Sequence, residues 1–231
     1  ANTTGATNVA VGYRALDANT TASNNTAVGG DALGANTTGA NNTAVGKAAF
    51  PTITTQDGNT GVGHGAGGIS TGEFNTYIGE IAGGNMTSGS HNICIGRASN
   101  SSSATSSGQC TLGDGNISTL RCNTQTISSL SDKRDKTEII DLPIGLDFIK
   151  KLTPRKFKWA SRDGNVKDGK YEAGFVAQEL QTVESSTSVD YLDLVLADNP
   201  DKLEASYGKL VPVLVNAIKE LSAKVTALEA G

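Results

Sequence analysis

Asn25-Thr26-Ala27-Val28-Gly29 is the stretch that decides the fold of the first half of the chain. It returns as Asn42-Thr43-Ala44-Val45-Gly46, and variants follow at 8–12, 59–63, 75–79, 92–96 and 109–113. The glycines that close the copies are 17 residues apart, or once 16: Gly12, Gly29, Gly46, Gly63, Gly79, Gly96 and Gly113. So regular a series indicates a repeat architecture.

Each period contains a short β-prone run, such as Ala27-Val28 or Tyr77-Ile78, set among the Asn, Gly and Thr residues that turns require. A period of 17 residues is too short for a pair of helices and suits one coil of a β-solenoid. One apolar residue per strand is little core, so we expect stacked coils and sister chains to bury the rest. Residues 1–117 resemble the head repeats of trimeric autotransporter adhesins and segments of phage fibres. The resemblance implies a homotrimeric fibre but identifies no ligand, and we interpret these coils as a spacer rod with no binding site of its own.

Composition excludes several classes of function. The net charge is −4 and no Lys/Arg stripe is present, so we expect no nucleic-acid partner. No apolar stretch approaches the roughly 18 residues of a membrane span, so we expect no membrane insertion. Aromatic residues make up only 5% of the chain and glycines number 28, which fits a thin fibre with closely packed backbones.

The histidines and cysteines do not form a recognisable site. His64 and His91 lie in or beside repeat turns without metal-ligand spacing, and we interpret them as solvated. We expect neither a metal nor a cofactor. Cys94, Cys110 and Cys122 lack CxxC spacing, so a disulfide framework is not expected. Cys94 and Cys110 are predicted to be small buried residues.

The composition changes near residue 130 from Gly, Ala, Asn, Thr and Ser to Lys, Glu, Asp and Leu, which marks a domain boundary. Before it, a weak alternation of apolar residues predicts short strands that end the repeat region: Ile117, Leu120, Ile127 and Leu130. We therefore divide the chain into repeats at 1–117, a junction at 118–130 and a C-terminal domain at 131–231.

In the C-terminal domain, residues 141–152 predict a short amphipathic helix with Pro143 in its first turn. Residues 157–159 and 171–176 predict a β-hairpin around a loop with Asp163-Gly164 and Asp168-Gly169, and a second helix should begin at Ala177.

The last segment, from Tyr207, has apolar or small residues at 207, 210, 214, 217, 221 and 228. Lys224 interrupts this stripe, while Val211, Ile218 and Val225 flank it. The pattern favours a coiled coil of about three heptads, expected in a trimer. The alternative is a helix packed on its own domain.

Five motifs occur in order in the second half: Ser131-Asp132-Lys133-Arg134-Asp135-Lys136, Leu152-Thr153-Pro154 with Phe157 and Trp159, Gly174-Phe175-Val176-Ala177-Gln178-Glu179, Val189-Asp190-Tyr191 and Ala217-Ile218-Lys219-Glu220-Leu221. Together they resemble the intramolecular chaperone domain of phage endosialidases and other tailspikes, peptidase family S74. The resemblance runs from about 128 to the end. Asp135 departs from it, since the family often has an apolar residue there.

The predicted fold class is mixed: β-solenoid-like homotrimeric fibre repeats, then an α+β chaperone domain with a terminal trimeric coiled-coil helix. The resemblance implies that Ser131 is the nucleophile, Lys136 its general base, and Ser131–Asp132 the bond that is cut. It implies a tail fibre or spike of a virion that meets a host-cell receptor, and a chaperone domain released in the host cytoplasm.

The chemistry adds conditions. A serine hydroxyl needs a base, and a lysine is a base only when neutral, which burial favours; Arg134 could support this. Residues five apart meet on neither a helix nor a strand, so either the chain turns sharply or Lys136 comes from a neighbouring chain.

The bond itself leaves alternatives open. Attack by Ser131 on its own carbonyl closes a strained four-membered ring. An N→O shift at Leu130–Ser131 closes a five-membered ring, and attack by a sister chain closes none.

Two other functions compete with this one. The first is an adhesin with a permanent, non-cleaving trimerisation domain. The second is a carbohydrate-degrading spike, which would need paired carboxylates, whereas residues 1–130 contain only scattered acids.

Overall fold

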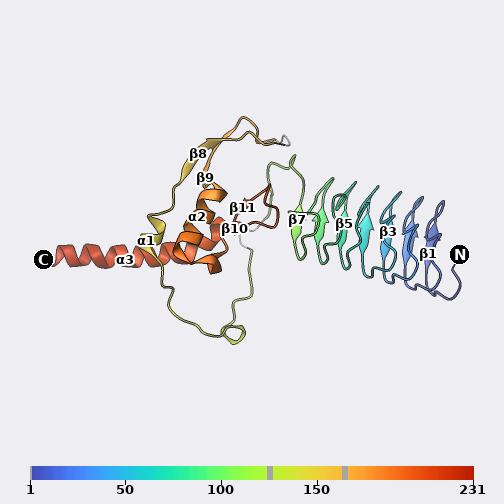
Figure 1. Cartoon of the computed structure of the whole chain (residues 1–231), viewed down its shortest axis with the longest axis horizontal. Helices are drawn as coiled ribbons and strands as arrows, with labels where there is room; N and C mark the ends of the chain where they lie inside the picture. The colour runs from blue at the N-terminus through green and yellow to red at the C-terminus, as the bar shows by residue number, and fades with distance from the viewer. Residues whose placement is uncertain (1, 124–126, 163–165) are drawn as a thin grey trace. The chain divides into compact units, whose positions relative to one another are not determined.

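The structure, a computed structural model, describes residues 2–123, 127–162 and 166–231. The chain divides into two compact units, one up to Ser118 and the other from Thr119 onward (Figure 1). Each unit is described by itself.

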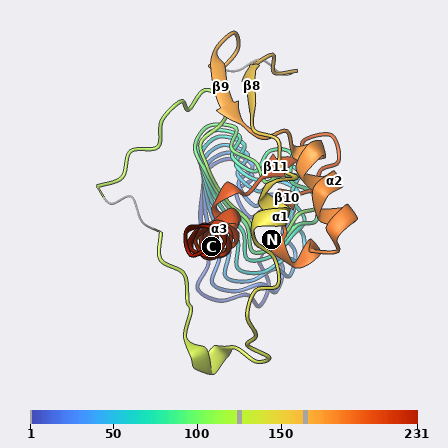
Figure 2. The ribbon, with the colours of Figure 1, turned by 90° about the vertical axis from the view of Figure 1, so that its left-hand side faces the viewer.

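The first unit is a parallel β-solenoid, as the repeat predicts. Its seven strands form one sheet in chain order: β1 (Val9–Val11), β2 (Thr26–Val28), β3 (Thr43–Val45), β4 (Thr60–Val62), β5 (Thr76–Ile78), β6 (Ile93–Ile95) and β7 (Cys110–Leu112). Equivalent residues pair from coil to coil, for example Ala27 with Ala44. Seen end-on in Figure 2, the coils follow one outline.

The interior of the solenoid is filled by the middle residues of strands β2 to β6 and by larger side chains from the turns. Ala27, Ala44 and Cys94 are fully buried strand residues, and Tyr77 and Phe50 are the largest fully buried side chains. The ring of Phe50 occupies space that glycines leave free, because a methyl group at Gly61 would lie 2.7 Å from it. Coil-to-coil variation in the repeat is thus compensated within the core.

A ladder of asparagines, all buried except Asn8, runs along the solenoid, one before each of the strands β1 to β6. The side-chain oxygen of Asn42 accepts a hydrogen bond from the backbone N–H of Asn59 at 2.8 Å, and its amide donates to the carbonyl of Gln56 at 2.8 Å. The other members repeat this pattern: Asn8, Asn25, Asn59, Asn75 and Asn92. Each asparagine therefore satisfies backbone groups of two turns that would otherwise be buried without partners.

The predicted strands at the junction are wrong. Among the described residues between Gly113 and Lys133 the chain forms no strand. The apolar residues on which the prediction rested are exposed: Ile117, Leu120, Ile127 and Leu130. An alternating pattern gives a strand only where another strand offers backbone partners, and none pairs with this segment.

The second unit contains short elements and one long helix. They are η1 (Lys133–Asp135), α1 (Leu146–Ile149), β8 (Arg155–Lys158), β9 (Tyr171–Gly174), α2 (Ala177–Thr187), η2 (Asp190–Leu192), β10 (Val195–Leu196), β11 (Glu204–Ala205), η3 (Tyr207–Leu210) and α3 (Val211–Glu229). β8 and β9 form the predicted antiparallel hairpin, and α2 begins at Ala177 as expected. Asp163-Gly164 of the predicted hairpin loop lies outside the described residues.

The core of this unit gathers Phe148 of α1, Leu180 of α2 and Val213 of α3, with Leu192 and Leu194 between them. The helix predicted over 141–152 shrinks to the four residues of α1. The preceding residues have no regular structure and are instead hydrogen-bonded to α3, as described below.

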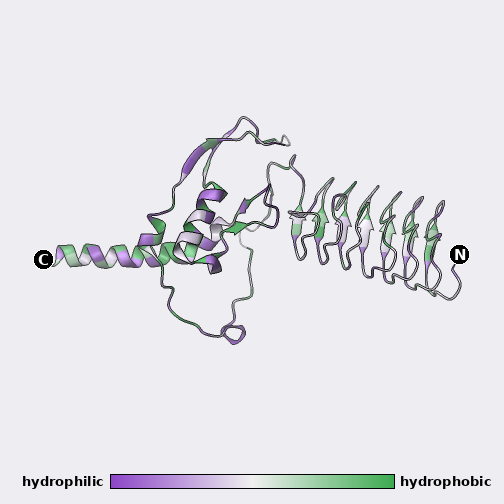
Figure 3. Cartoon of the chain, in the orientation of Figure 1, coloured by the Kyte–Doolittle hydropathy of each residue, from purple (hydrophilic) through white to green (hydrophobic). Residues whose placement is uncertain are grey.

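The apolar stripe predicted for the last segment divides between two faces of α3. Leu210, Val213 and Ala217 are buried against the rest of the unit. The exposed stripe alternates by three and four without interruption: Val211, Leu214, Ile218, Leu221, Val225 and Leu228. Green patches continue along α3 in Figure 3, beyond the part that packs on the unit. The alternative of a helix packed on its own domain is thus confirmed for the inner face, whereas the coiled coil stays a prediction for the exposed stripe, whose register is the flanking one.

Candidate active site

Ser131 and Lys136 lie on either side of η1, a 3-10 helix of one turn. The carboxylate of Asp132 caps the turn by accepting a hydrogen bond from the backbone N–H of Arg134 at 2.8 Å. The N–H of Lys136 closes it by donating to the carbonyl of Lys133 at 3.2 Å. Since such a turn has about three residues per revolution, the chain leaves it beside the point where it entered.

The turn brings the two side chains into contact. Nζ of Lys136 donates to Oγ of Ser131 at 2.6 Å and reaches the Ser131 carbonyl oxygen at 3.4 Å. Of the two ways in which residues five apart could meet, the structure shows the sharp turn within one chain. An amine within hydrogen-bond distance of a serine hydroxyl has the geometry that a general base requires.

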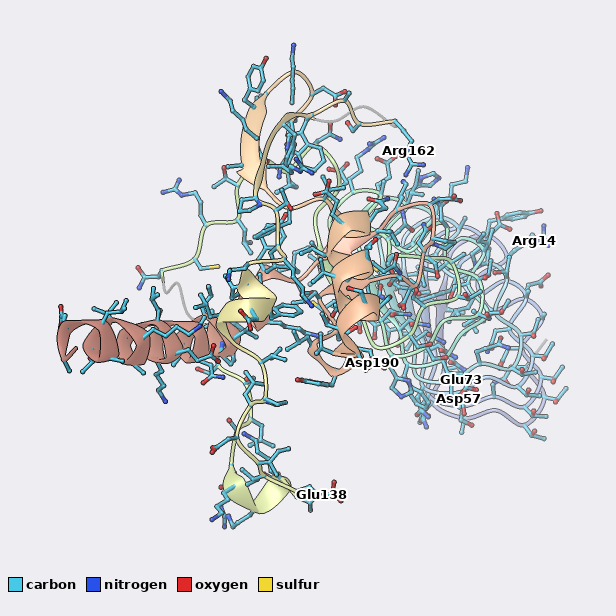
Figure 4. The ribbon with its side chains drawn as sticks, turned by 60° about the vertical axis from the view of Figure 1, so that its left-hand side comes forward. Arg14, Asp57, Glu73, Glu138, Arg162 and Asp190 are labelled. Carbon is cyan, nitrogen blue, oxygen red and sulfur yellow. The ribbon has the colours of Figure 1, made fainter. Side chains whose placement is uncertain are left out.

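The surroundings of this contact are open to water. Ser131 and residues 133–140 are exposed, and Figure 4 shows Glu138 pointing away from the rest of the second unit beside the η1 turn. Solvent favours the charged form of a lysine, whereas a base must be neutral. A single chain therefore has the geometry of a serine–lysine pair but not its low-dielectric environment.

Arg134 is engaged with Asp132. Its Nε and Nη2 donate to the two carboxylate oxygens at 3.1 and 2.7 Å. Hydrogen bonds from the guanidinium hold the pKa of Asp132 below its ordinary value, and the carboxylate raises the pKa of Arg134. Arg134, the predicted supporting residue, thus stabilises the η1 turn. It binds Asp132, the residue on the C-terminal side of the predicted scissile bond.

The histidines lie apart from this site in the sequence and in different coils. Nδ1 of His64 is 4.0 Å from Oε1 of Glu80, and both side chains are at least half exposed. The ring of His91 lies against that of Phe74, with ring centroids 5.1 Å apart. Within the described ranges no group of three or more His, Cys, Asp and Glu side chains could hold a metal ion. Nor does any helix there have the length and apolarity needed to cross a membrane.

The cysteine prediction is half right. Cys94 is fully buried with Sγ 3.8 Å from Oγ of Ser101, and burial raises the pKa of its thiol. Cys110 is exposed, because it pairs with Ile93 rather than with Cys94. A shift of one position along a strand turns the side chain to the opposite face.

Sequence reasoning missed the residues that hold the chain just after the site. Asn216 and Glu220 of α3 bind the backbone of residues 142–146. Their partners are more than 70 positions away in the sequence, so no local pattern marks them. Polar residues on the inner face of an otherwise apolar helix are the one signal that could have drawn attention to them.

Comparison with protein-family models gives one finding for this region. Residues 131–189 match the model described as chaperone of endosialidase, named Peptidase S74. This part of the chain is therefore similar to that family. The match begins at Ser131, the first residue of the serine–lysine contact, and includes η1, α1, the β8–β9 hairpin and α2.

The region that matches the chaperone of endosialidase model therefore carries the serine–lysine contact at its very start. Comparisons with curated proteins and with solved structures gave no match.

Proposed function

We propose that this chain is the C-terminal part of a phage tail fibre or spike. Its chaperone domain joins three chains, guides folding of the solenoid, and then releases itself by cutting at Ser131. The observation that carries the proposal is the 2.6 Å contact between Lys136 Nζ and Ser131 Oγ at the start of the family match.

The outer face of the solenoid supports association of chains. The residues on either side of each buried strand centre point outward, and many are apolar and partly exposed: Val11, Val45, Val62, Ile78, Ile93, Ile95 and Leu112. A continuous apolar band of this kind marks an interaction surface in a soluble protein. A sister chain that presents the same band is the partner we propose.

The exposed stripe of α3 supports association at the other end of the chain. Val211, Ile218 and Val225 take one heptad position, and three leucines take the other. Lys224 and Glu229 are spaced to form an ion pair between neighbouring parallel helices. β-branched residues at the first position with leucine at the second favour two strands. The count of three must therefore come from the solenoid and the chaperone domain.

The chemical step follows from the contact. Once assembly buries the pair, neutral Lys136 takes the proton of Ser131, and Oγ attacks the carbonyl carbon of the Ser131–Asp132 bond. The C–N bond breaks, Lys136 returns the proton to the Asp132 amine, and water hydrolyses the resulting ester. Attack on the carbonyl of a neighbouring chain avoids the four-membered ring, so we propose that a trimer is needed.

Cleavage makes assembly irreversible. While the domain is attached, it raises the local concentration of three chain ends and sets their register. After release, a solenoid that unfolds has lost its guide, and kinetic barriers hold the product in place.

The test is the mass of the intact chain under denaturing conditions, after native mass determination of the assembly. Wild type should form trimers and yield two fragments, whereas Ser131→Ala and Lys136→Ala should form trimers and stay whole. Ser129→Ala and Lys133→Ala are matched controls that should be cut like wild type. Fragment masses distinguish cleavage at Ser131–Asp132 from cleavage at Leu130–Ser131. Wild-type trimers that stay uncut for days would instead favour a permanent trimerisation domain.

Mixed trimers separate the remaining alternatives. If the pair forms within one chain, trimers that combine Ser131→Ala with Lys136→Ala chains contain no complete pair and stay whole. If such a pair attacks a neighbour, Ser131→Ala chains are cut when they assemble with wild type. Cleavage in the first mixture would show that serine and lysine come from different chains.

A further inference from the structure

We infer that Asn216 and Glu220 are positioning residues that couple assembly of α3 to the order of the segment carrying Ser131 and Lys136. The inference rests on the proposed function and names the contact through which assembly controls cleavage. We call residues 142–146 the strap.

Asn216 holds the first half of the strap. Its side-chain amide donates to the carbonyl of Leu142 at 3.1 Å and to that of Ile144 at 2.7 Å. The same amide lies 3.5 Å from Oε1 of Glu220. One side chain of α3 therefore satisfies two backbone carbonyls of a segment that has no regular structure of its own.

Glu220 holds the second half. Its Oε2 accepts a hydrogen bond from the backbone N–H of Leu146 at 2.9 Å. Gly145 is buried, and a methyl group there would overlap Oε1 of Glu220. The carboxylate is thus seated directly against the backbone of the strap, and glycine at 145 makes room for it.

The strap is the first part of the chain after the serine–lysine pair that the described residues of α3 bind. Only residues 137–141 separate Lys136 from it, and these are exposed. The position and direction in which the chain leaves Leu142 therefore restrict where Ser131 and Lys136 can lie. The five connecting residues span at most about 20 Å, so Lys136 must lie within that distance of Leu142.

α3 has two faces with different tasks. Val213, Asn216, Ala217 and Glu220 are spaced by three and four and face the second unit. The exposed stripe that we propose as the trimer seam lies on the other side. Because a helix is rigid, alignment of three seams fixes the three inner faces, and hence the three straps, around one axis. A loose monomer imposes no such arrangement, so its serine–lysine pair has no neighbouring chain to attack.

Three substitutions test the coupling. Asn216→Asp keeps the size of the side chain but replaces the donor by an oxygen that repels two carbonyls. Glu220→Ala removes the acceptor for Leu146, and Glu220→Gln keeps an acceptor oxygen in place. Ser222→Ala, an exposed change on α3, is the control. For each we would measure trimer formation by native mass, the cleavage rate in preformed trimers, and hydrogen exchange of the Leu146 amide.

We expect all four variants to form trimers. Asn216→Asp and Glu220→Ala should be cut roughly tenfold to a hundredfold more slowly, because a small misplacement of reacting groups has that effect. Glu220→Gln should be rescued to within about twofold of wild type, as a hydrogen-bond role predicts. If Asn216→Asp fails to fold, the pair Glu220→Ala and Glu220→Gln decides the question.

Two outcomes overturn the inference. The first is cleavage at the wild-type rate in Glu220→Ala trimers whose Leu146 amide exchanges fast; the proposed function would then stand without the coupling. The second concerns wild-type trimers that are never cut, a result that by itself refutes only the proposed cleavage. The coupling is then judged in Ser131→Ala chains. Trimer formation must slow hydrogen exchange over residues 131–141, and an added Glu220→Ala substitution must abolish that slowing. Equal exchange in trimers with and without Glu220→Ala would refute the coupling.

Discussion

Gly29 and Gly30 are neighbours in the solenoid and have different roles. Gly29 has φ of +135°, and a methyl group there would lie 2.5 Å from the carbonyl oxygen of Gly46 in the next coil. At Gly30 the nearest atom to such a methyl group would be the carbonyl oxygen of Tyr13, at 3.8 Å. The repeated glycine is therefore required by backbone conformation and by the close approach of coils, whereas the glycine after it is not.

Gly29→Ala should lower the free energy of unfolding by about 3 kcal/mol, the sum of a strained backbone and a clash. Gly30→Ala should change it by less than about 1 kcal/mol. Thermal and denaturant unfolding of the full chain, kept whole by Ser131→Ala and followed by the β-sheet signal, measures both. Equal effects would show that the coils can separate to admit a side chain.

Asn42→Ala should destabilise the solenoid by about 2–4 kcal/mol. The change leaves the buried Asn59 N–H and the partly buried Gln56 carbonyl without their partner. Asn24→Gly is the matched control, because Asn24 is exposed and glycine keeps its positive φ; its effect should be within about 0.5 kcal/mol. The same unfolding experiment compares them, and a neutral Asn42→Ala would remove the ladder from the account of stability.

At the scale of elements, the sequence predicts those whose partners lie nearby. The β8–β9 hairpin follows from two β-prone runs around a loop, and the strands of the solenoid follow from the period. The asparagine ladder and α1 do not. Asparagine among Gly and Thr is typical of a turn, and the partners of Asn42 lie 14 and 17 residues away. A helix over 141–152 agrees with local propensity, but Asn216 offers the strap hydrogen bonds that a helix would otherwise make internally.

The hairpin carries a pH-sensitive contact that the single tryptophan can report. Nε1 of Trp159 donates to Glu172 at 2.6 Å, and this hydrogen bond, with the charge of Lys167, lowers the pKa of Glu172 below 4.5. A carboxyl whose folded pKa is lowered adds stability above its unfolded pKa and loses it as the pH falls through the folded value. The pair should therefore be intact above pH 4.5 and separate in more acidic solution.

Trp159 fluorescence should titrate with a midpoint below pH 4.5. In Glu172→Gln the signal should stay flat over the same range, because the amide does not ionise. Emission spectra of both chains between neutral and acidic pH make the comparison. A midpoint at or above the ordinary value for glutamate would contradict the contact.

At the scale of the whole molecule, the family resemblance and the mixed fold class could be predicted from the sequence. The sequence also identifies Ser131 and Lys136 as a pair, but not the geometry of their contact. The spacing of Ser131 and Lys136 does not reveal the η1 turn. The turn depends on a cap in which the Asp132 side chain accepts a hydrogen bond from the N–H of Arg134. The face of α3 that packs inward was equally out of reach. Two apolar stripes overlap in that segment, and only the core around Phe148 and Leu180 decides which of them is buried.

The division of α3 predicts two different failures. Ile218→Lys, on the exposed stripe, should reduce assembly of the proposed trimer while each second unit stays folded. Val213→Lys places a charge in a fully buried position and should destabilise the unit by about 3–5 kcal/mol. Native mass and thermal unfolding of both chains, in the Ser131→Ala background, separate the two effects. A stable trimer of Ile218→Lys would exclude this face as the seam.

The asparagine ladder also bears on how such proteins change over generations. Every coil meets its neighbours through the same pairs, and β4 and β5 stay in register across the one short, 16-residue period. Duplication or loss of one period in the gene would therefore insert or remove a complete layer, about 4.8 Å thick, whose polar groups find partners at once. The length of the fibre thus changes in whole layers by recombination, most easily between coils whose cores do not depend on a matched pair such as Phe50 and Gly61.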